Sequence, residues 1–361
     1  MSSTMDLGPK GPRPDQESAL QFEGRKVDHI RLSLDTKNQA DGLSGLDQVH
    51  LEHEALPDLD FSEISIQVQS LGQDLLTPFL VSSMTAGHAD STSLNLLMAS
   101  ACAERGWRMG VGSQRRELSE PEVASEWRQI RQLVPRVQLL GNLGISQLIR
   151  TETDQVEALV EALEAKAMII HLNALQECLQ PEGTPNFKGS LKAIERLCQT
   201  LSVPVVIKET GCGFSAATLA RLKNIGVAAV DISGLGGTHW GRIEGDRNHA
   251  SNIRRAAAES LASWGIPTVE SMRNALALEV DYEIWASGGV RSGLDAAKLL
   301  AMGAQTVGFA MPILNAALLG ERELLHKMSV LEYELKTALF CTGCSSVADL
   351  QSKKVWQWRG K

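Results

Sequence analysis

Four polar side chains, His171, Asn173, Gln176 and Glu177, follow closely on the apolar run Met168-Ile169-Ile170. An imidazole, two amides and a carboxylate can bind a polar ligand and a cation. Gln176 has no useful pKa, so it cannot act as a strong base on its own. Burying such a cluster without a ligand would be unfavourable. The cluster therefore predicts a ligand-binding enzyme site and argues against an inert scaffold.

Lys208 stands at the end of the apolar run 203–207. A buried ammonium group is unfavourable unless an anion lies beside it. One partner would be a phosphate-bearing cofactor with an electron-rich ring, such as a reduced flavin. The other reading is a structural salt bridge to Glu209 or Glu177, and the residues alone leave both readings open.

Two glycine-rich segments, 233–238 and 287–293, are suited to bring backbone N–H groups close to an anion. The second directly precedes a helical pattern, and its Arg291 can make a bidentate contact with a phosphate. Each segment alone is equally typical of a tight turn. Their meaning depends on where the fold places them.

The elements that would position these residues are short apolar runs alternating with helical patterns. This alternation predicts parallel strands with crossover helices, and eight repeats favour an α/β fold, a closed (β/α)8 TIM barrel. The predicted strands are 78–81, 108–111, 138–141, 168–171, 203–207, 228–232, 283–286 and 306–309. The predicted helices are 93–105, 119–132, 152–165, 188–200, 215–224, 267–278, 292–302 and 321–339.

In such a barrel the loops after the strands form the active-site face, and phosphate commonly binds after strands seven and eight. The segment 287–293 and the turn 308–311 occupy those places. The expected organisation is a disordered N-terminal tail (1–24), an N-terminal extension contributing to the substrate site (25–77), the barrel (78–350) and a C-terminal tail (351–361). Alternating Ile64, Ile66 and Val68 suggest a weak hairpin inside the extension.

Composition excludes several classes of function. The net charge of −8 has the wrong sign for binding nucleic acid through bulk charge. Apolar runs fall far short of a membrane span, so no membrane association is expected. The 6 cysteines do not form a disulfide framework or a four-ligand zinc site, which fits a reducing cytoplasm.

From about Arg25 to Leu350 the chain resembles the type 2 isopentenyl diphosphate isomerases, which are FMN-dependent (β/α)8 barrel enzymes. The resemblance rests on the 171–177 segment with 180–183, and on Arg25-Lys26-Val27-Asp28-His29. It implies interconversion of isopentenyl and dimethylallyl diphosphate by a flavin-assisted 1,3-allylic proton shift in isoprenoid biosynthesis. It also implies a reduced FMN as the active form, NADPH as reductant, Mg²⁺, and a homo-oligomer, a tetramer or octamer.

The resemblance assigns roles residue by residue. It places Arg25, Lys26 and Arg115 on the substrate and makes Glu177 the Mg²⁺ ligand. It places Gln176 beside the isoprene carbons, with His171 and Asn173 as its catalytic neighbours. For FMN it implies Ser83, Met84, Thr85, Ser113, Asn142, Lys208, Ser233, Thr238, Gly289, Val290, Arg291, Ala310 and Met311.

Four positions depart from the family pattern: Ala86, Thr210, Cys212 and His239. His239 is expected to put a titratable ring near the flavin loop. The alternative function is an FMN-dependent oxidoreductase of the 2-hydroxy-acid oxidase or glutamate-synthase type on the same barrel. Such enzymes use a histidine near strand seven as base, and none lies between Ala250 and Arg322.

Overall fold

The computed structural model describes residues 19–84, 91–247 and 251–360. Its centre is a closed barrel of parallel strands in which each strand pairs with the next along the chain, and the last pairs with the first through Val307 and Phe79. The strands are β4 (Phe79–Val81), β5 (Arg108–Gly110), β6 (Gln138–Gly144), β7 (Met168–Leu172), β8 (Val205–Glu209), β9 (Ala229–Asp231), β10 (Glu283–Ala286) and β11 (Thr306–Phe309). All eight predicted runs are strands, and the predicted (β/α)8 barrel is confirmed.

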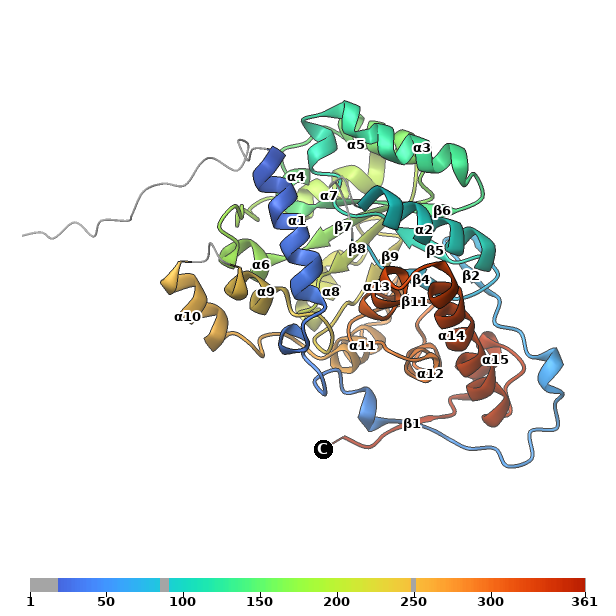
Figure 1. The fold of residues 1–361 in the computed structure, drawn as a ribbon. Helices are drawn as coiled ribbons and strands as arrows, with labels where there is room; N and C mark the ends of the chain where they lie inside the picture. Colours follow the sequence, from blue (N-terminus) through green and yellow to red (C-terminus); the bar gives the residue numbers. More distant parts are fainter. Residues whose placement is uncertain (1–18, 85–90, 248–250, 361) are drawn as a thin grey trace, which may run out of the picture.

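Helices surround the barrel (Figure 1). In α5 the buried residues Val156, Leu159, Val160 and Leu163 recur at helical spacing, so one face packs on the strands. The predicted helices all form: α2 (Ser91–Arg105), α3 (Ser125–Leu133), α5 (Thr153–Leu163), α7 (Ser190–Thr200), α8 (Ala216–Leu222), α11 (Thr268–Leu276), α12 (Gly293–Ala301) and α14 (Glu321–Cys341).

Further helices lie in loops where the sequence analysis expected none. They are α4 (Ile145–Leu148), α6 (Ala174–Leu179), α9 (Trp240–Asp246), α10 (Asn252–Ser260), α13 (Met311–Leu318) and α15 (Val347–Lys353). Most are short, and a helix of one or two turns shows little periodicity in sequence. Helices α6, α9 and α13 follow β7, β9 and β11 respectively, so they stand at the active-site face.

The expected N-terminal boundary at residue 25 is wrong, because helix α1 (Ala19–Ser33) runs through it. The part of the expected tail before residue 19 lies outside the described residues. In Figure 1 α1, in blue, crosses in front of β7 and β8. Side chains of α1 line the same pocket as residues at the strand ends, so the extension forms part of the barrel mouth.

The expected C-terminal tail 351–361 is also wrong for most of its length. Helix α15 continues to Lys353, and strand β12 (Trp356–Trp358) pairs antiparallel with β1 (Val49–Leu51). Arg273 of α11 lies over the ring of Trp358, 4.9 Å from its centroid. The N-terminal extension and the C-terminal segment are therefore held together against the barrel helices.

At the N-terminal ends of the barrel strands, the hairpin of β2 (Val68–Ser70) and β3 (Gln73–Leu75) closes the base. The strand pairing begins only at Val68, later than the alternation from Ile64 suggested. Leu71, in the hairpin turn, packs against the apolar interior of the barrel. The interior layer consists of Leu80, Leu140, Ala167, Ile169, Val206, Ala229 and Trp285.

A polar network joins this hairpin to the barrel base. Arg108 donates to the Ser70 carbonyl (2.9 Å) and to the Ser70 hydroxyl (3.0 Å). The Glu283 carboxylate accepts from the Ser70 hydroxyl (2.6 Å), the Leu71 N–H (2.6 Å) and the Trp285 indole (3.0 Å). Burial lowers the pKa of Arg108 to about 10, which leaves it charged at neutral pH. The base of the barrel thus satisfies its buried charges internally.

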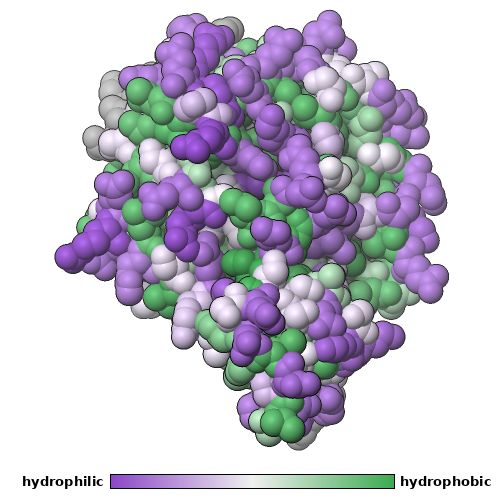
Figure 2. Space-filling view, turned by 90° about the vertical axis from the view of Figure 1, so that its right-hand side faces the viewer, coloured by the Kyte–Doolittle hydropathy of each residue, from purple (hydrophilic) through white to green (hydrophobic). Residues whose placement is uncertain are grey.

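Hydrophilic residues cover most of the face shown in Figure 2, and hydrophobic side chains are scattered among them in small groups. Such scattering is ordinary for a protein surface. Among the described residues, none of the helices has both the length and the apolar composition that crossing a membrane requires.

Candidate active site

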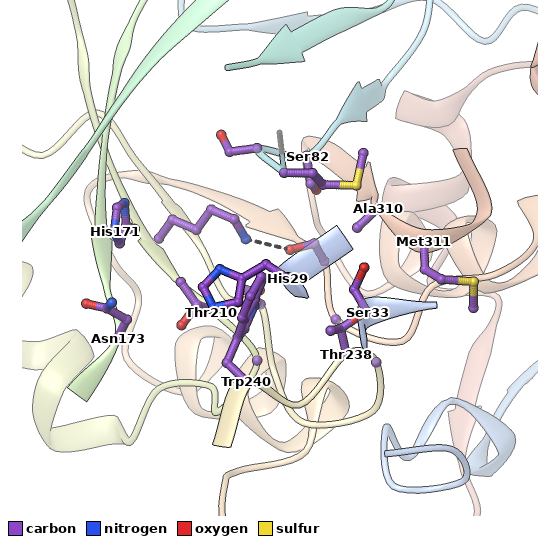
Figure 3. Close-up of a pocket in the computed structure, with 18 of the residues that line it drawn as sticks. His29, Ser33, Ser82, His171, Asn173, Thr210, Thr238, Trp240, Ala310 and Met311 are labelled. Carbon is purple, nitrogen blue, oxygen red and sulfur yellow. Dashed lines mark hydrogen bonds between the residues drawn. The ribbon is translucent and has the colours of Figure 1, made fainter. Parts of the chain in front are cut away.

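One pocket opens at the C-terminal ends of the barrel strands (Figure 3). In Figure 3 His171 and Asn173 lie on one side, Ala310 and Met311 lie opposite, and His29 and Trp240 lie between them. Thr85 lies outside the described residues. Every other predicted site residue lines this pocket: Arg25, Lys26, Ser83, Met84, Ser113, Arg115, Asn142, His171, Asn173, Gln176, Glu177, Lys208, Ser233, Thr238, Gly289, Val290, Arg291, Ala310 and Met311.

Lys208 is buried in the pocket wall beside Asp231, its neighbour on the adjacent strand. Its Nζ lies 3.0 Å from Asp231 Oδ2 and donates to the Ser287 hydroxyl at 3.2 Å. Ser287 in turn donates to Asp231 Oδ1 at 2.7 Å. The sequence analysis named Glu209 or Glu177 as the structural partner of Lys208, and both predictions are wrong. Strand register brings Asp231 to this place instead.

Glu209 points away from Lys208 and binds its own loop. Its Oε2 accepts from the backbone N–H groups of Thr210 (2.8 Å), Gly213 (3.1 Å) and Cys212. Burial raises the pKa of Glu209 to about 7, against the lowering effect of these N–H groups. Because Thr210 and Gly211 line the pocket, this carboxyl group holds part of the pocket wall.

His171 lies at the end of β7 with its Nδ1 2.9 Å from Asn142 Oδ1. Burial lowers the pKa of His171 to about 3, and the positive charges of Lys26 and Lys208 contribute to the shift. The imidazole is therefore neutral at physiological pH. Asn142 is itself held by a hydrogen bond from its Nδ2 to the Val111 carbonyl, at 3.1 Å.

Glu177 stands on α6, the short helix that follows β7. Its Oε1 accepts from Asn173 Nδ2 (3.0 Å) and its Oε2 accepts from the Thr184 backbone N–H. Within the described ranges, no cluster of three or more histidine, cysteine or acidic side chains could hold a metal ion. Mg²⁺ keeps several waters and needs few protein ligands, so the single carboxylate of Glu177 fits a Mg²⁺ that is also bound by phosphate oxygens.

Sequence reasoning missed a buried charged network behind Gln176. Glu244 Oε1 lies 2.9 Å from His29 Nε2 and accepts from Gln176 Nε2 at 3.1 Å. Arg247 donates to Glu244 Oε2 (2.8 Å) and to both oxygens of Glu182 (2.9 Å each). Burial raises the pKa of Glu244, but the His29 hydrogen bond and the Arg247 charge outweigh it and hold this pKa at about 2. The network fixes the orientation of the Gln176 amide.

The two glycine-rich loops meet beside the pocket. Gly289 has a φ of +77°, and a Cβ there would lie 2.5 Å from the Gly236 carbonyl oxygen. A Cβ on Gly237 would lie 2.7 Å from the Gly289 nitrogen. Only glycine fits at these two positions, which lets backbone approach the pocket.

Two helices begin next to these loops, and their first turns differ. Helix α12 is capped by Ser292 and Asp295, which accept from backbone N–H groups of its first turn and its cap. Helix α13 has no side-chain cap, and its first residues, Met311 and Pro312, line the pocket. Of the two, α13 has the open N-terminus that suits a phosphate group.

Arg291 links the loops to the N-terminal extension. Its guanidinium donates to the carbonyls of Gly236 (3.0 Å) and Gly289 (3.2 Å) and forms an ion pair with Asp41. The extension also pairs with the loop after β9, because the Ala40 N–H donates to the Gly237 carbonyl at 2.7 Å. The predicted contact of Arg291 with a phosphate stays a prediction.

His239 does not lie where the sequence analysis expected it. The residue is buried and does not contribute to the pocket lining. Its Nδ1 accepts from the Arg242 backbone N–H at 3.2 Å and its Nε2 lies 3.0 Å from the Trp264 carbonyl oxygen. The ring caps α9 and does not enter the pocket.

Several buried polar atoms at the pocket have no hydrogen-bond partner in the described part of the chain. They are the hydroxyl oxygens of Ser82 and Ser83 and the Asn173 side-chain oxygen. Buried polar groups are nearly always paired in folded proteins, so such atoms in a pocket indicate that a polar ligand completes them. With the uncapped α13 and the glycine loops, they fit a phosphate-bearing cofactor of the size of FMN.

Comparison with known proteins identifies one matching family model and several similar sequences. The model of the FMN-dependent dehydrogenase family matches residues 172–357. An isopentenyl-diphosphate delta-isomerase of Legionella pneumophila is 54% identical over 338 residues, which cover 94% of this chain and 99% of the relative. The enzyme of the same name from Bdellovibrio bacteriovorus is 51% identical over 345 residues, with the same coverage.

Solved structures share the fold at much lower identity. A mandelate oxidase variant superposes with a TM-score of 0.61 at 16% identity and covers 93% of this chain and 97% of its own. A flavocytochrome b2 variant gives a TM-score of 0.66 at 19% identity, covering 93% and 83%. These structures confirm the barrel architecture, and the high identity to the first group decides the family. The chain belongs to the isopentenyl-diphosphate delta-isomerase family, built on the barrel of the FMN-dependent dehydrogenases.

Proposed function

We propose that this chain interconverts isopentenyl diphosphate and dimethylallyl diphosphate in isoprenoid biosynthesis by a 1,3-allylic proton shift. The reaction adds a proton at one carbon and removes one from another, with no net oxidation. The observation that carries the proposal is the convergence of Gln176, Glu177 and Lys208 on one pocket with the basic pair Arg25 and Lys26 of α1. The relatives at 54% and 51% identity support the same reaction.

The FMN site is proposed from the part of the pocket that carries the unpaired serines and the glycine loops. The first turn of α13 and the Gly289 loop would hold the phosphate. Lys208, kept in place by Asp231, would stabilise negative charge on the ring. When bound in its reduced form, FMN supplies the proton-exchanging group that the side chains of this pocket lack.

The chain's own residues bind and orient the substrate. Arg25, Lys26 and Arg115 offer positive charge for the diphosphate, and Glu177 offers one oxygen ligand to a Mg²⁺ that bridges to it. The Gln176 amide, held by Glu244, would lie beside the alkene carbons. A glutamine does not titrate, so its part is to position the alkene and exclude water. NADPH would reduce the flavin before turnover.

The oxidoreductase alternative is disfavoured. Its support is the shared fold with mandelate oxidase and flavocytochrome b2, at 16–19% identity. In this chain the loops after β10 and β11 carry no histidine that could remove a proton from a 2-hydroxy acid. We also propose, from the family resemblance alone, a homo-oligomer of four or eight chains, which light scattering on the purified holoenzyme would test.

The decisive experiment incubates the FMN-loaded protein with isopentenyl diphosphate and Mg²⁺. One sample holds oxidised flavin and the other holds flavin reduced by NADPH or dithionite under nitrogen. The expected result is formation of dimethylallyl diphosphate with the reduced sample only, without consumption of reductant. Equal turnover in both samples would contradict the role of the flavin. Oxidation of added 2-hydroxy acids would support the alternative function.

A further inference from the structure

Three histidines lie in or next to the pocket, and their hydrogen bonds determine which ring nitrogen carries the proton. Burial lowers the pKa of His29, His171 and His239 in each case, so all three rings are neutral at pH 7. A neutral imidazole has one N–H donor and one accepting nitrogen, and its partners decide which is which. The hydrogen-bond partners therefore assign a tautomer to each of the three rings.

His29 and His239 carry the proton on Nε2. The partner of His29 Nε2 is a carboxylate oxygen of Glu244, which can only accept. His239 Nδ1 accepts from the Arg242 backbone N–H, which can only donate, so its Nε2 donates to the Trp264 carbonyl. Both rings therefore direct their N–H away from the pocket interior, toward fixed acceptors.

His171 has the opposite arrangement. The Nδ2 group of Asn142 donates to the Val111 carbonyl, which can only accept, and this contact fixes the orientation of the amide. The Asn142 oxygen then faces His171 Nδ1 at 2.9 Å. Because an amide oxygen can only accept, Nδ1 carries the proton. His171 lines the pocket, so Nε2 is the nitrogen left to meet a ligand there.

We propose that Asn142 is a positioning residue that holds His171 as the Nδ1–H tautomer, so that His171 presents an accepting Nε2 to the ligand. An accepting nitrogen binds a donor, such as a metal-bound water or a hydroxyl group. It does not act as a third cation for a fully ionised diphosphate. This inference deepens the proposed function and relies on it only for the nature of the ligand.

The test reads the tautomers directly from holoenzyme labelled with ¹⁵N-histidine. Two-bond ¹H–¹⁵N spectra distinguish protonated from unprotonated ring nitrogens, and a His171→Asn variant identifies the His171 signals. The expected result is a protonated Nδ1 and a bare Nε2 in His171, unchanged between pH 5 and 8. His29 and His239 are expected to show the reverse pattern in the same spectrum. A His171 ring protonated on Nε2 without ligand would overturn the proposal.

Two variants at Asn142 sharpen the result. Asn142→Ser removes the acceptor, so His171 is expected to show both tautomers while His239 keeps its own. Asn142→Asp places a carboxylate beside Nδ1 and is expected to raise the pKa of His171. An unchanged His171 tautomer in both folded variants would show that Asn142 does not set it. If neither variant folds, neutron diffraction from wild-type crystals locates the proton.

Titration with inorganic diphosphate completes the experiment. On saturation Nδ1 of His171 is expected to stay protonated, and Nε2 is expected to stay bare while its chemical shift changes. Protonation of Nε2 on saturation would overturn the proposed accepting role. These spectra involve no turnover, so their outcome is independent of the isomerisation assay. A protein inactive as an isomerase could still show the tautomer, and an active one could lack it.

Discussion

The two ends of the barrel treat buried polar groups in opposite ways. At the base, Arg108, Ser70 and Glu283 satisfy one another and the turn of the β2–β3 hairpin. At the mouth, buried oxygens of Ser82, Ser83 and Asn173 have no partner within the described chain. The same strands run from the base to the mouth, so the difference lies in the side chains at their ends. The buried charges of the base are satisfied within the protein, although the Thr77 hydroxyl there has no hydrogen-bond partner among the described residues, whereas the mouth leaves several buried oxygens for a ligand.

The largest expected effect comes from removing the cation of the pocket. Lys208→Met leaves Asp231 buried without its positive partner, and we expect a loss of about 3–5 kcal/mol in the free energy of unfolding. FMN affinity should fall as well. Urea denaturation and fluorescence titration with FMN measure the two effects. In the double variant Lys208→Met/Asp231→Asn the stability should largely return and the FMN affinity should not.

Arg108→Met is the matched change at the base. It removes a buried cation, as Lys208→Met does, so we expect a comparable loss in the free energy of unfolding. FMN affinity should stay within about twofold of the wild-type value at temperatures where the variant is folded. If Arg108→Met weakened FMN binding as much as Lys208→Met, the two ends would not be independent. The proposed separation of stability from binding would then be wrong.

Glu177→Gln is expected to lower Mg²⁺-dependent turnover about 100-fold or more, because an amide is a weaker ligand for Mg²⁺ than a carboxylate. The yellow colour of bound FMN should persist, since Glu177 belongs to the proposed substrate site and not to the proposed FMN site. Isomerase assays over a Mg²⁺ series measure the effect, with the exposed Glu161→Gln as control. Loss of the flavin in Glu177→Gln would instead give Glu177 a structural role.

The raised pKa of Glu209, about 7, predicts a pH dependence of stability. Between the unfolded value near 4.5 and pH 7 the folded state binds the proton more readily, so this group's stabilising contribution is lost as pH rises toward 7. Glu209→Gln should lack this loss. Between pH 4.5 and 8, the free energy of unfolding of the wild type should therefore fall by on the order of 1–3 kcal/mol more than that of the variant. Parallel pH profiles for wild type and variant would contradict it.

The smallest expected effect comes from replacing one serine by alanine at the base of the barrel and one at its mouth. Ser70→Ala removes a hydroxyl that bonds to Glu283 and Arg108, and we expect a loss of about 1–2 kcal/mol. Ser82→Ala removes an unpaired buried hydroxyl, so the protein without FMN should be unchanged or slightly more stable. With FMN present, Ser82→Ala should weaken binding. A clear destabilisation of the FMN-free Ser82→Ala protein would remove the contrast.

Much of the fold could be predicted because apolar runs and helical periods are local patterns. All eight barrel strands and the helices that cover them follow from such patterns. The short helices α6, α9 and α13 could not be predicted, because one or two turns carry little periodicity. His239 illustrates the difficulty, since it caps α9 with a side chain that is not a usual helix cap.

The residues of the site were predicted better than their partners. Strand ends and the family resemblance brought the pocket-lining residues together, but Lys208 pairs with Asp231 through strand register, which the sequence alone does not reveal. No sequence pattern predicted the buried pair of Glu244 and Arg247 at the end of α9. Their partners are His29 on α1 and Glu182 in the loop after α6, which are distant in sequence. Contacts between distant segments are the part that needed the structure.

The pairing of β1 with β12 has a consequence for how the protein is made. The extension leaves the ribosome first, yet β1 has no strand to pair with until Trp356–Trp358 have been synthesised. β1 can therefore take its final place only after the barrel strands have been synthesised. The catalytic mouth takes side chains from α1 of the same extension, so we expect it to be completed late in translation.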